Sequence, residues 1–419
     1  MRTIRSSDRS ALDQLVAQDE TRNGSVERQA GRIVSDVRQR GDEALREWTQ
    51  KLDRGPKSAA GSSRVSVAPI SMAELKKGWA ATPKAVRDAI ALAASNLAKV
   101  AKKQVPQPFV VSVATGHRIE QRVQPLARVG CYVPGGRYPL PSTLLMTAIP
   151  ARVAGVKDIV VTCPAPAPVV MAAALEAGVS ELYAIGGAQA IGALAYGTES
   201  IARVDKIVGP GNAWVAAAKA LVSRDCPIDL HAGPSEIVVC SDRGNPEWIA
   251  ADLIAQAEHD PAARSIFVTT KSKLADAVTA EVARQMPSSG PAAASLAAHG
   301  AIIIAASRRE AIEVVNRLAP EHLVIDHDDD PSRYSAAGTI FVGDFSVQAA
   351  GDYCTGSNHV LPTGGAARFR GGLSAADFVR VFSVQTLSAA ALRRIGPAAV
   401  ELAEAEGLTA HANSIRARL

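Results

Sequence analysis

A helix-like segment at residues 245–261 brings two potential metal ligands together. Asn245 followed by Pro246 is typical of a helix start. Gln256 and His259 are three residues apart, so they would lie on one helix face near its C-terminal end. An imidazole nitrogen and a nearby side-chain oxygen can hold a metal ion. Spacing alone favours the simpler alternative, a surface glutamine followed by a histidine that the helix dipole stabilises.

A second segment, LAPEHLVID, pairs a carboxylate with an imidazole. Pro320 ends the preceding helix, and Glu321 and His322 then open an apolar strand. This pair suits proton transfer, because histidine titrates near neutral pH and an apolar pocket raises the pKa of a glutamate toward it. Without further context an ordinary pair of loop residues is the simpler interpretation.

Two further segments contain histidine and carboxylate side chains. The glycine-rich residues 349–365 include Asp352, a potential metal ligand, and His359, a potential substrate contact, with a surface loop as the alternative. The polar C-terminal segment contains Glu406 and His411. A histidine this close to a chain end is usually incidental, and these two residues gain a role only if another subunit needs them.

Three turns could accept a nucleotide. They are PGGRYPLP, IGGAQA and GPGNA, and each follows a predicted strand and opens a predicted helix. GPGNA has two of the dinucleotide-binding glycines but not the third, and Asp225 and Asp229 follow the wrong elements to replace the acidic residue expected about 20 positions on. The pattern alone gives moderate support for nucleotide binding at one sheet edge.

These residues require a scaffold of alternating strands and helices. Four strand–turn–helix units follow one another in residues 129–234, and a second alternating block covers about 235–345. Two helical stretches precede them at 26–50 and 72–103, followed by two strands around the turn Thr115–Gly116. We therefore predict an α/β fold with two doubly wound, Rossmann-like parallel-sheet domains and an N-terminal helical part.

Composition excludes several classes of protein. The 419 residues carry a net charge of +5, and we find no basic run with interleaved aromatics, so we expect no nucleic-acid partner. The five cysteines are scattered and do not indicate a disulfide framework. No apolar run approaches the roughly 20 residues that span a bilayer, and the first residues lack an apolar signal core. We expect a cytoplasmic protein without a membrane partner.

Taken together, these segments resemble the histidinol dehydrogenase family. The resemblance rests on motifs in family order from about residue 125 to the C-terminus, and the N-terminal helical part carries few signature residues. The motifs are CYVPGGRYP, IGGAQAI, VGPGNAWVAAAK, IDLHAGPSE, AADLIAQAEHDP, APEHL, GDYCTGSNHVLPT and EGLTAH.

The resemblance implies one Zn²⁺ per active site. The ligands that it implies are Gln256, His259, Asp352 and His411. The substrate contacts that it implies include these four ligands together with Ser235, His322, His359 and Glu406. The NAD contacts that it implies are Tyr132, Gln189 and Asn212.

The resemblance also implies a homodimer with shared active sites, in which the C-terminal extension swaps between subunits. The domains expected are an N-terminal arm (1–24), a first α/β domain with the zinc ligands and the catalytic pair (25–128 plus 235–365), a second α/β domain with the NAD-contacting loops (129–234) and a C-terminal dimerisation segment (366–419).

The activity implied is NAD-dependent oxidation of L-histidinol through its aldehyde to L-histidine, the last steps of histidine biosynthesis. His322 would accept the proton in each oxidation, and Glu321 would activate the water that attacks the aldehyde. Three alternatives remain: a related zinc/NAD dehydrogenase of another small alcohol such as a sulfonated diol, a zinc hydrolase, and a non-catalytic binding module. Arg137–Tyr138 is a variable point that leaves the substrate slightly open, and His231 has no assigned role.

Overall fold

The structure is a computed structural model that describes residues 1–17, 24–53, 66–135, 138–231 and 233–419, so Arg137 lies outside the described residues. It contains two parallel sheets and one antiparallel sheet. The predicted α/β fold with parallel sheets is confirmed. None of the described helices is long and apolar enough to cross a membrane.

The first parallel sheet has four strands in the order β6-β5-β4-β7. Its strands are β4 (Arg128–Tyr132), β5 (Asp158–Thr162), β6 (Glu181–Tyr183) and β7 (Lys206–Val208). The helices that follow these strands are α6 (Pro141–Ala154), α7 (Pro168–Ala177), α8 (Gly187–Tyr196) and α9 (Ala213–Val222). The four predicted strand–turn–helix units are all present. Helix α6 follows β4 and helix α9 follows β7, and these two helices pack on opposite faces of the sheet. The neighbouring strands β4 and β7 therefore form the topological switch point of the sheet.

The second parallel sheet has six strands in the order β1-β10-β9-β8-β11-β12. Its strands are β1 (Arg2–Arg5), β8 (Glu236–Cys240), β9 (Arg264–Thr269), β10 (Ala301–Ile304), β11 (His322–Ile325) and β12 (Thr339–Val342). Its helices are α1 (Arg9–Val16), α10 (Pro246–Ala257), α11 (Ser272–Gln285), α12 (Ala292–Ala298), α13 (Arg308–Leu318) and α14 (Gln348–Gly351). Successive residues of β8 alternate between two buried clusters, one with α10–α12 and one with α1 and α13, which is the strand period of two.

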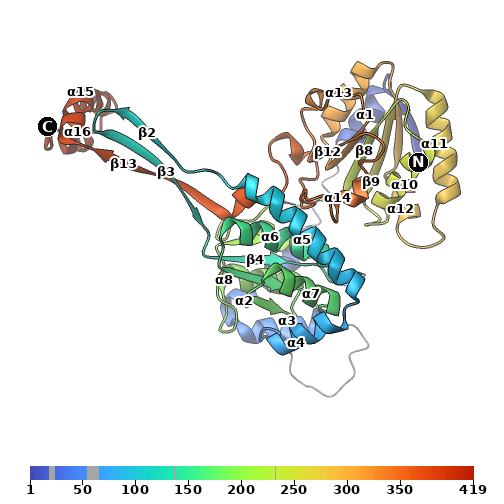
Figure 1. The fold of residues 1–419 in the computed structure, drawn as a ribbon, viewed down its shortest axis with the longest axis horizontal. Coiled ribbons are helices and arrows are strands. Elements are labelled where there is room, and N and C mark those ends of the chain that lie inside the picture. The colour runs from blue at the N-terminus through green and yellow to red at the C-terminus, as the bar shows by residue number, and fades with distance from the viewer. Residues whose placement is uncertain (18–23, 54–65, 136–137, 232) are drawn as a thin grey trace.

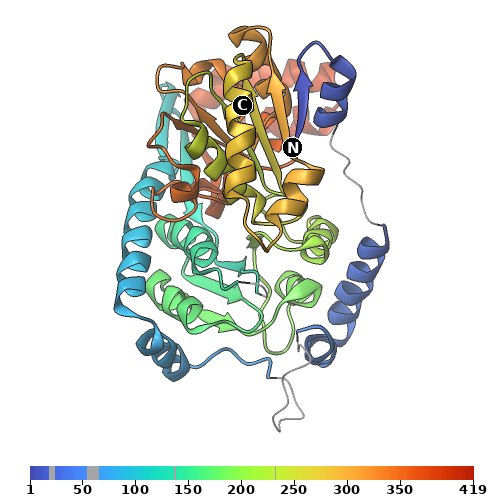
Figure 2. The same ribbon diagram turned by 90° about the vertical axis from the view of Figure 1, so that its right-hand side faces the viewer.

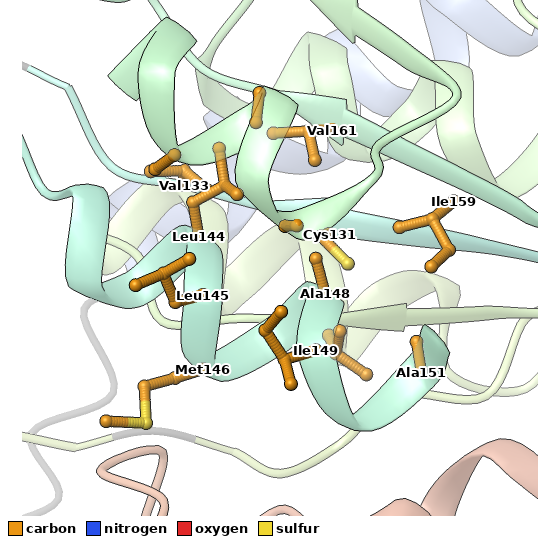
Figure 3. Close-up of a cluster of buried hydrophobic side chains, with 14 of the residues drawn as sticks. Cys131, Val133, Leu144, Leu145, Met146, Ala148, Ile149, Ala151, Ile159 and Val161 are labelled. Atoms are coloured by element: carbon orange, nitrogen blue, oxygen red, sulfur yellow. The ribbon is translucent and has the colours of Figure 1, made fainter. Parts of the chain in front are cut away.

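The N-terminal helices belong with the four-stranded sheet. They are α2 (Gly24–Arg40), α3 (Asp42–Leu52), α4 (Met72–Ala81) and α5 (Lys84–Gln104). Helices α2 and α3 share one buried cluster with α8 and α9, and α4 and α5 share the opposite cluster with α6 and α7 (Figures 1 and 2). Figure 3 shows part of the second cluster, where side chains of α6 gather with those of β4 and β5.

This packing corrects two expected domain boundaries. The helices within residues 25–128 pack on the four-stranded sheet, although α5 also contacts residues 235–365 through Asn96 Nδ2, which donates to the carbonyl of Cys354. Glycines permit their close approach to the helices of the four-stranded sheet, since a Cβ at Gly78 of α4 would lie 2.7 Å from Met171 of α7. The expected arm of residues 1–24 is also wrong for its first part, because β1 forms an edge of the six-stranded sheet and Leu12 and Leu15 of α1 are buried.

The third sheet is an antiparallel arm. Its strands β2 (Phe109–Ala114), β3 (His117–Pro125) and β13 (Val379–Leu387) pair in the order β13-β3-β2. The predicted strand pair around Thr115–Gly116 is confirmed, with Gly116 at φ +74°. The strands run away from both parallel sheets and end at α15 (Ala389–Ala405), α16 (Thr409–Arg416) and the C-terminus (Figure 1). Between the body and β13 lie the short 3-10 helices η2 (Ala366–Arg368) and η3 (Ala375–Phe378), and η1 (Pro331–Arg333) precedes β12.

Candidate active site

The predicted catalytic pair lies at the amino-terminal edge of the six-stranded sheet. His322 is the first residue of β11 and pairs in register with Ile237 of the neighbouring strand β8. Glu321 and His322 are 5% and 4% exposed, so the alternative of an ordinary loop pair is wrong. Helix α10 runs back across the sheet after β8, which returns its C-terminal end to this same edge.

The main chain of Glu236 orients both predicted catalytic side chains. Its N–H donates to Glu321 Oε2 at 2.8 Å, and its carbonyl oxygen accepts from His322 Nδ1 at 3.1 Å. Because a carbonyl can only accept, Nδ1 carries the proton and Nε2 keeps a free lone pair. Burial raises the pKa of Glu321 well above its ordinary value and lowers the pKa of His322. Burial thus acts against the charged form of each group.

Asp352 lies beside this pair. Its Oδ1 is 3.7 Å from His322 Nε2, and its Oδ2 accepts from Gln348 Nε2 at 2.9 Å. His359 Nδ1 donates to the main-chain oxygen of Asp352 at 3.0 Å, and burial lowers its pKa. The segment is therefore a folded part of the site, and the alternative of a plain surface loop is wrong.

Gln256 is the clearest sign of a missing ligand. Its side chain is fully buried, yet within the described part of the chain neither its amide nitrogen nor its amide oxygen has a hydrogen-bond partner. An unpaired buried polar group costs about 1–3 kcal/mol, so such groups normally have a partner. His259 is exposed in this chain, and its Nδ1 donates to the carbonyl of Ala255 at 3.1 Å, which leaves Nε2 free. The alternative of a surface glutamine is wrong.

These residues fit a zinc ion chemically. Gln256, His259 and Asp352 supply an amide oxygen, an imidazole nitrogen and a carboxylate, which are N and O ligands that zinc accepts. The described residues contain no group of three or more His, Cys, Asp or Glu side chains placed to hold a metal. Two of the four expected ligands would not be counted in such a group. Gln256 is an amide, and His411 lies far away in the arm (Figure 1).

The structure does not bring Glu406 and His411 to this site within one chain. Glu406 is the C-terminal cap of α15 and His411 lies in α16, and both are exposed. Figure 1 shows these helices at the far end of the arm, remote from α10 and α14. The nine-residue strands β3 and β13 carry them there. Ser235, by contrast, immediately precedes β8, where its carbonyl accepts from Arg264 N.

The three predicted nucleotide contacts lie at the carboxyl end of the four-stranded sheet. Tyr132 ends β4, and its hydroxyl accepts from Gly187 N at 3.1 Å. Gln189 lies in the first turn of α8 and is fully buried. Asn212 caps α9, where its side chain accepts from Trp214 N and Val215 N. Burial raises the pKa of Tyr132 to about 12, so this hydroxyl stays protonated.

Two carboxylates that the sequence did not identify hold the predicted nucleotide loops, and Asp229 is buried while Asp53 is partly buried. Asp229, set aside because it follows the wrong element, accepts from Gly209 N at 2.6 Å and forms a buried ion pair with Lys219. Asp53 accepts from Gly186 N at 2.9 Å. No sequence signal could have identified Asp53, since it lies far from these loops along the chain.

Helix α6, which covers the four-stranded sheet, contacts the segment that contains His359. Thr143, at the start of α6 and beyond the loop after β4, has its Oγ1 3.4 Å from His359 Nε2. Asn358 Nδ2 donates to the carbonyl of Met146 in the same helix. A group bound at the carboxyl end of the four-stranded sheet would thus lie on the side of the molecule that faces the catalytic pair.

Comparison with known proteins gives one consistent result. The profile of the family described as Histidinol dehydrogenase matches residues 16–419. The chain is 47% identical over 398 residues to "Histidinol dehydrogenase" of Agrobacterium fabrum, covering 92% of this chain and 91% of that protein. It is 44% identical over 416 residues to the protein of the same name from Zymomonas mobilis, covering 97% and 95%. The crystal structure of histidinol dehydrogenase from Elizabethkingia anophelis superposes with a TM-score of 0.91 at 32% identity, covering 100% and 98%.

Proposed function

Because the chain belongs to the histidinol dehydrogenase family, we propose that it oxidises L-histidinol through the bound aldehyde to L-histidine, using zinc and NAD. The observation that supports this most directly is the group of Glu321, His322 and Asp352 at one sheet edge, with His322 Nε2 3.7 Å from Asp352 Oδ1. An alcohol oxidation needs a base beside the group that orients the substrate, and this arrangement supplies both.

Gln256, His259 and Asp352 would hold the zinc, with His411 of a second subunit as the fourth ligand. The unpartnered amide of buried Gln256 supports this assignment. Bound zinc would supply a fixed positive charge that orients the substrate nitrogens, and bound NAD would supply the hydride acceptor. Tyr132, Gln189 and Asn212 would contact the NAD, and Ser235, His359 and Glu406 would complete the substrate contacts.

His322 would accept the alcohol proton at Nε2, since Nδ1 already donates to the carbonyl of Glu236. Its lowered pKa keeps it neutral and ready to accept a proton at neutral pH. Glu321, buried beside it, would remove a proton from the water that attacks the aldehyde, and its raised pKa makes it a stronger base than an exposed glutamate. As water attacks, His322 would give its first proton to the aldehyde oxygen, which leaves a hydrate and a neutral imidazole. His322 would then accept the proton of the hydrate hydroxyl in the second oxidation, and Glu321 would release its proton to solvent. Burial of both groups would shield the reactive aldehyde from bulk solvent.

A shared active site would explain the arm. Glu406 and His411 have no partner at the candidate site within their own chain, and β2 exposes Val110, Val111 and Val113 to solvent. A homodimer in which each arm reaches the other subunit would bury this surface and complete both sites.

The test is turnover of L-histidinol by the zinc-loaded protein. We expect NADH to form and histidine to accumulate, with two hydrides transferred per substrate. No NADH from histidinol, with oxidation of a sulfonated diol instead, would reassign the chain to a related alcohol dehydrogenase. Hydrolysis of an ester or amide without NAD would instead favour a zinc hydrolase.

A further inference from the structure

Asp53 connects the N-terminal helices to the turn after β6. It directly follows α3, and both of its carboxylate oxygens are used. Oδ2 accepts from Gly186 N at 2.9 Å, and Oδ1 accepts from Gln189 Nε2 at 3.2 Å. A carboxylate in this partly buried position has a pKa raised by burial, and it accepts but never donates while ionised.

This contact determines which end of the Gln189 amide faces Asp53. Only the NH2 end can donate to a carboxylate, so Nε2 points to Asp53 and Oε1 points away. Gln189 is fully buried, yet Oε1 has no hydrogen-bond partner among the residues that the structure describes. A buried acceptor without a donor is costly, which indicates that a donor from outside the chain completes it.

Glycine packs closely against this oxygen. A Cβ at Gly187 would lie 2.5 Å from Gln189 Oε1, which is closer than real Cβ contacts, and Gly187 has φ +63°. The N–H of Gly187 is already used by the Tyr132 hydroxyl, and that of Gly186 by Asp53. The loop therefore offers an acceptor oxygen, and these two glycine N–H groups are not available to an anion.

We propose that Asp53 is a positioning residue for the cofactor: it sets the polarity of the Gln189 amide so that Oε1 accepts a hydrogen bond from bound NAD. The matching donors on that cofactor are ribose hydroxyls and the amino groups of adenine and of the nicotinamide carboxamide. The proposal rests on the NAD site proposed above, and it adds a residue outside the three nucleotide loops.

Two substitutions separate this role from a simple structural brace. In D53N the oxygen of the new side-chain amide keeps its bond to Gly186 N, and the NH2 group of that amide faces Gln189. The Gln189 amide must then turn, so that its Oε1 accepts from this NH2 group and its Nε2 faces the ligand. In D53A the Gln189 amide has no partner on that side and can keep its productive orientation. NADH affinity should therefore fall about tenfold or more in D53N and only severalfold in D53A.

A purely structural role for Asp53 predicts the opposite order, with NADH affinity lower in D53A than in D53N. Alanine removes both hydrogen bonds of Asp53, and asparagine keeps at least one. We expect thermal stability to follow the brace order, with D53A less stable than D53N, while NADH affinity follows the polarity order. Affinity would be measured by titrating the zinc-loaded protein with NADH and following tryptophan fluorescence. In steady state, KM for NAD should rise in D53N while KM for histidinol and the zinc content stay at wild-type values.

The control is D36N on α2, which removes an aspartate with similar hydrogen bonding and no contact with the nucleotide loops. It should leave NADH affinity unchanged. Wild-type affinity in D53N, or weaker binding by D53A than by D53N, would overturn the proposal and leave the NAD site intact. Failure of the wild-type protein to bind NADH at all would overturn the NAD site and this proposal together.

Discussion

Glu321 and His322 have separate proposed roles, water activation and proton acceptance. Both contact the main chain of Glu236, but through different atoms, so their roles can be separated. His322 presents Nε2 toward Asp352, while Glu321 is the carboxylate that we propose activates water. The first oxidation consumes no water, and only the second requires it.

Replacing Glu321 with Gln should therefore spare the first oxidation and slow the second by about a hundredfold or more, the usual contribution of a general base. Rapid-mixing measurement of NADH should show a normal first phase and a slow second phase, with the aldehyde retained. Equal losses in both phases would contradict the separate roles. H322A is the comparison variant, because it should slow both phases.

Gln348 should affect zinc affinity without being a ligand. It is 1% exposed, and its NH2 group donates to Asp352 Oδ2. Outer hydrogen-bond partners of this kind orient a ligand carboxylate, and their loss typically weakens metal binding about 10–100-fold. We expect Q348A to lose zinc to a chromogenic chelator at correspondingly lower chelator concentration. Q285A on α11 is the control, and an unchanged zinc affinity in Q348A would rule out this role.

Helix α10 brings the proposed metal ligands to the sheet edge where the predicted catalytic pair lies. Helix α10 starts at Asn245, whose side chain accepts from Glu247 N, with Pro246 in the first turn as expected. Its length carries Gln256 and His259 from the carboxyl edge of the six-stranded sheet back to the amino edge, where Glu321 and His322 begin β11. The position of the proposed metal ligands thus depends on where one helix starts and how long it is.

Asp36 of α2 is one of the residues that link this helix to α3, and it gives a pH-dependent prediction. Asp36 accepts two bonds from Arg40 and one from Trp48 Nε1 of α3, and the hydrogen bond from Arg40 lowers its pKa. A carboxylate with a lowered pKa stabilises the fold above its unfolded pKa, about 3.9, and this stabilisation disappears as pH falls through the folded value.

D36N should therefore lower the free energy of unfolding by about 1–2 kcal/mol at pH 7. The difference from wild type should shrink below about pH 4, because the wild-type carboxyl is then protonated as well. Urea unfolding at the two pH values measures this. A difference of the same size at both would show that the contribution comes from packing and not from the charge.

In the whole molecule, the residues of the candidate site are divided between the body and the arm. Most of its residues lie on the body, while Glu406 and His411 lie on helices at the end of an antiparallel ribbon. Completion by a second subunit follows from the proposed function and has a direct test. In a mixed dimer, a variant of the body and a variant of the arm would damage the same site and leave the other site intact.

H259A and H411A should each abolish histidinol oxidation as homodimers. Mixed and refolded together, they should recover about a quarter of wild-type activity, since about half of the dimers would be mixed and each would contain one intact site. Activity assays before and after mixing measure this. No recovery from a mixture that contains mixed dimers would mean that His411 does not act on the partner's site.

The sequence by itself determined what is local. The helix start at Asn245 and the four strand–turn–helix units depend on neighbouring residues, and the structure has them. The expected placement of Gln256 and His259 on one helix face is wrong for His259, because α10 ends at Ala257 with Glu258 as its cap. Family resemblance, carried by contiguous motifs, was also readable and is confirmed.

Only the tertiary structure decided which elements meet. An amphipathic helix shows that it has an apolar face but not which sheet that face covers, because hydrophobic burial is non-directional. This is why α2–α5 were expected on the six-stranded sheet and instead pack on the four-stranded one. The approach of Asp352 to His322, and of Asp53 to the Gln189 loop, likewise joins residues far apart in the chain. Such contacts depend on the geometry of the folded chain, which no local pattern contains.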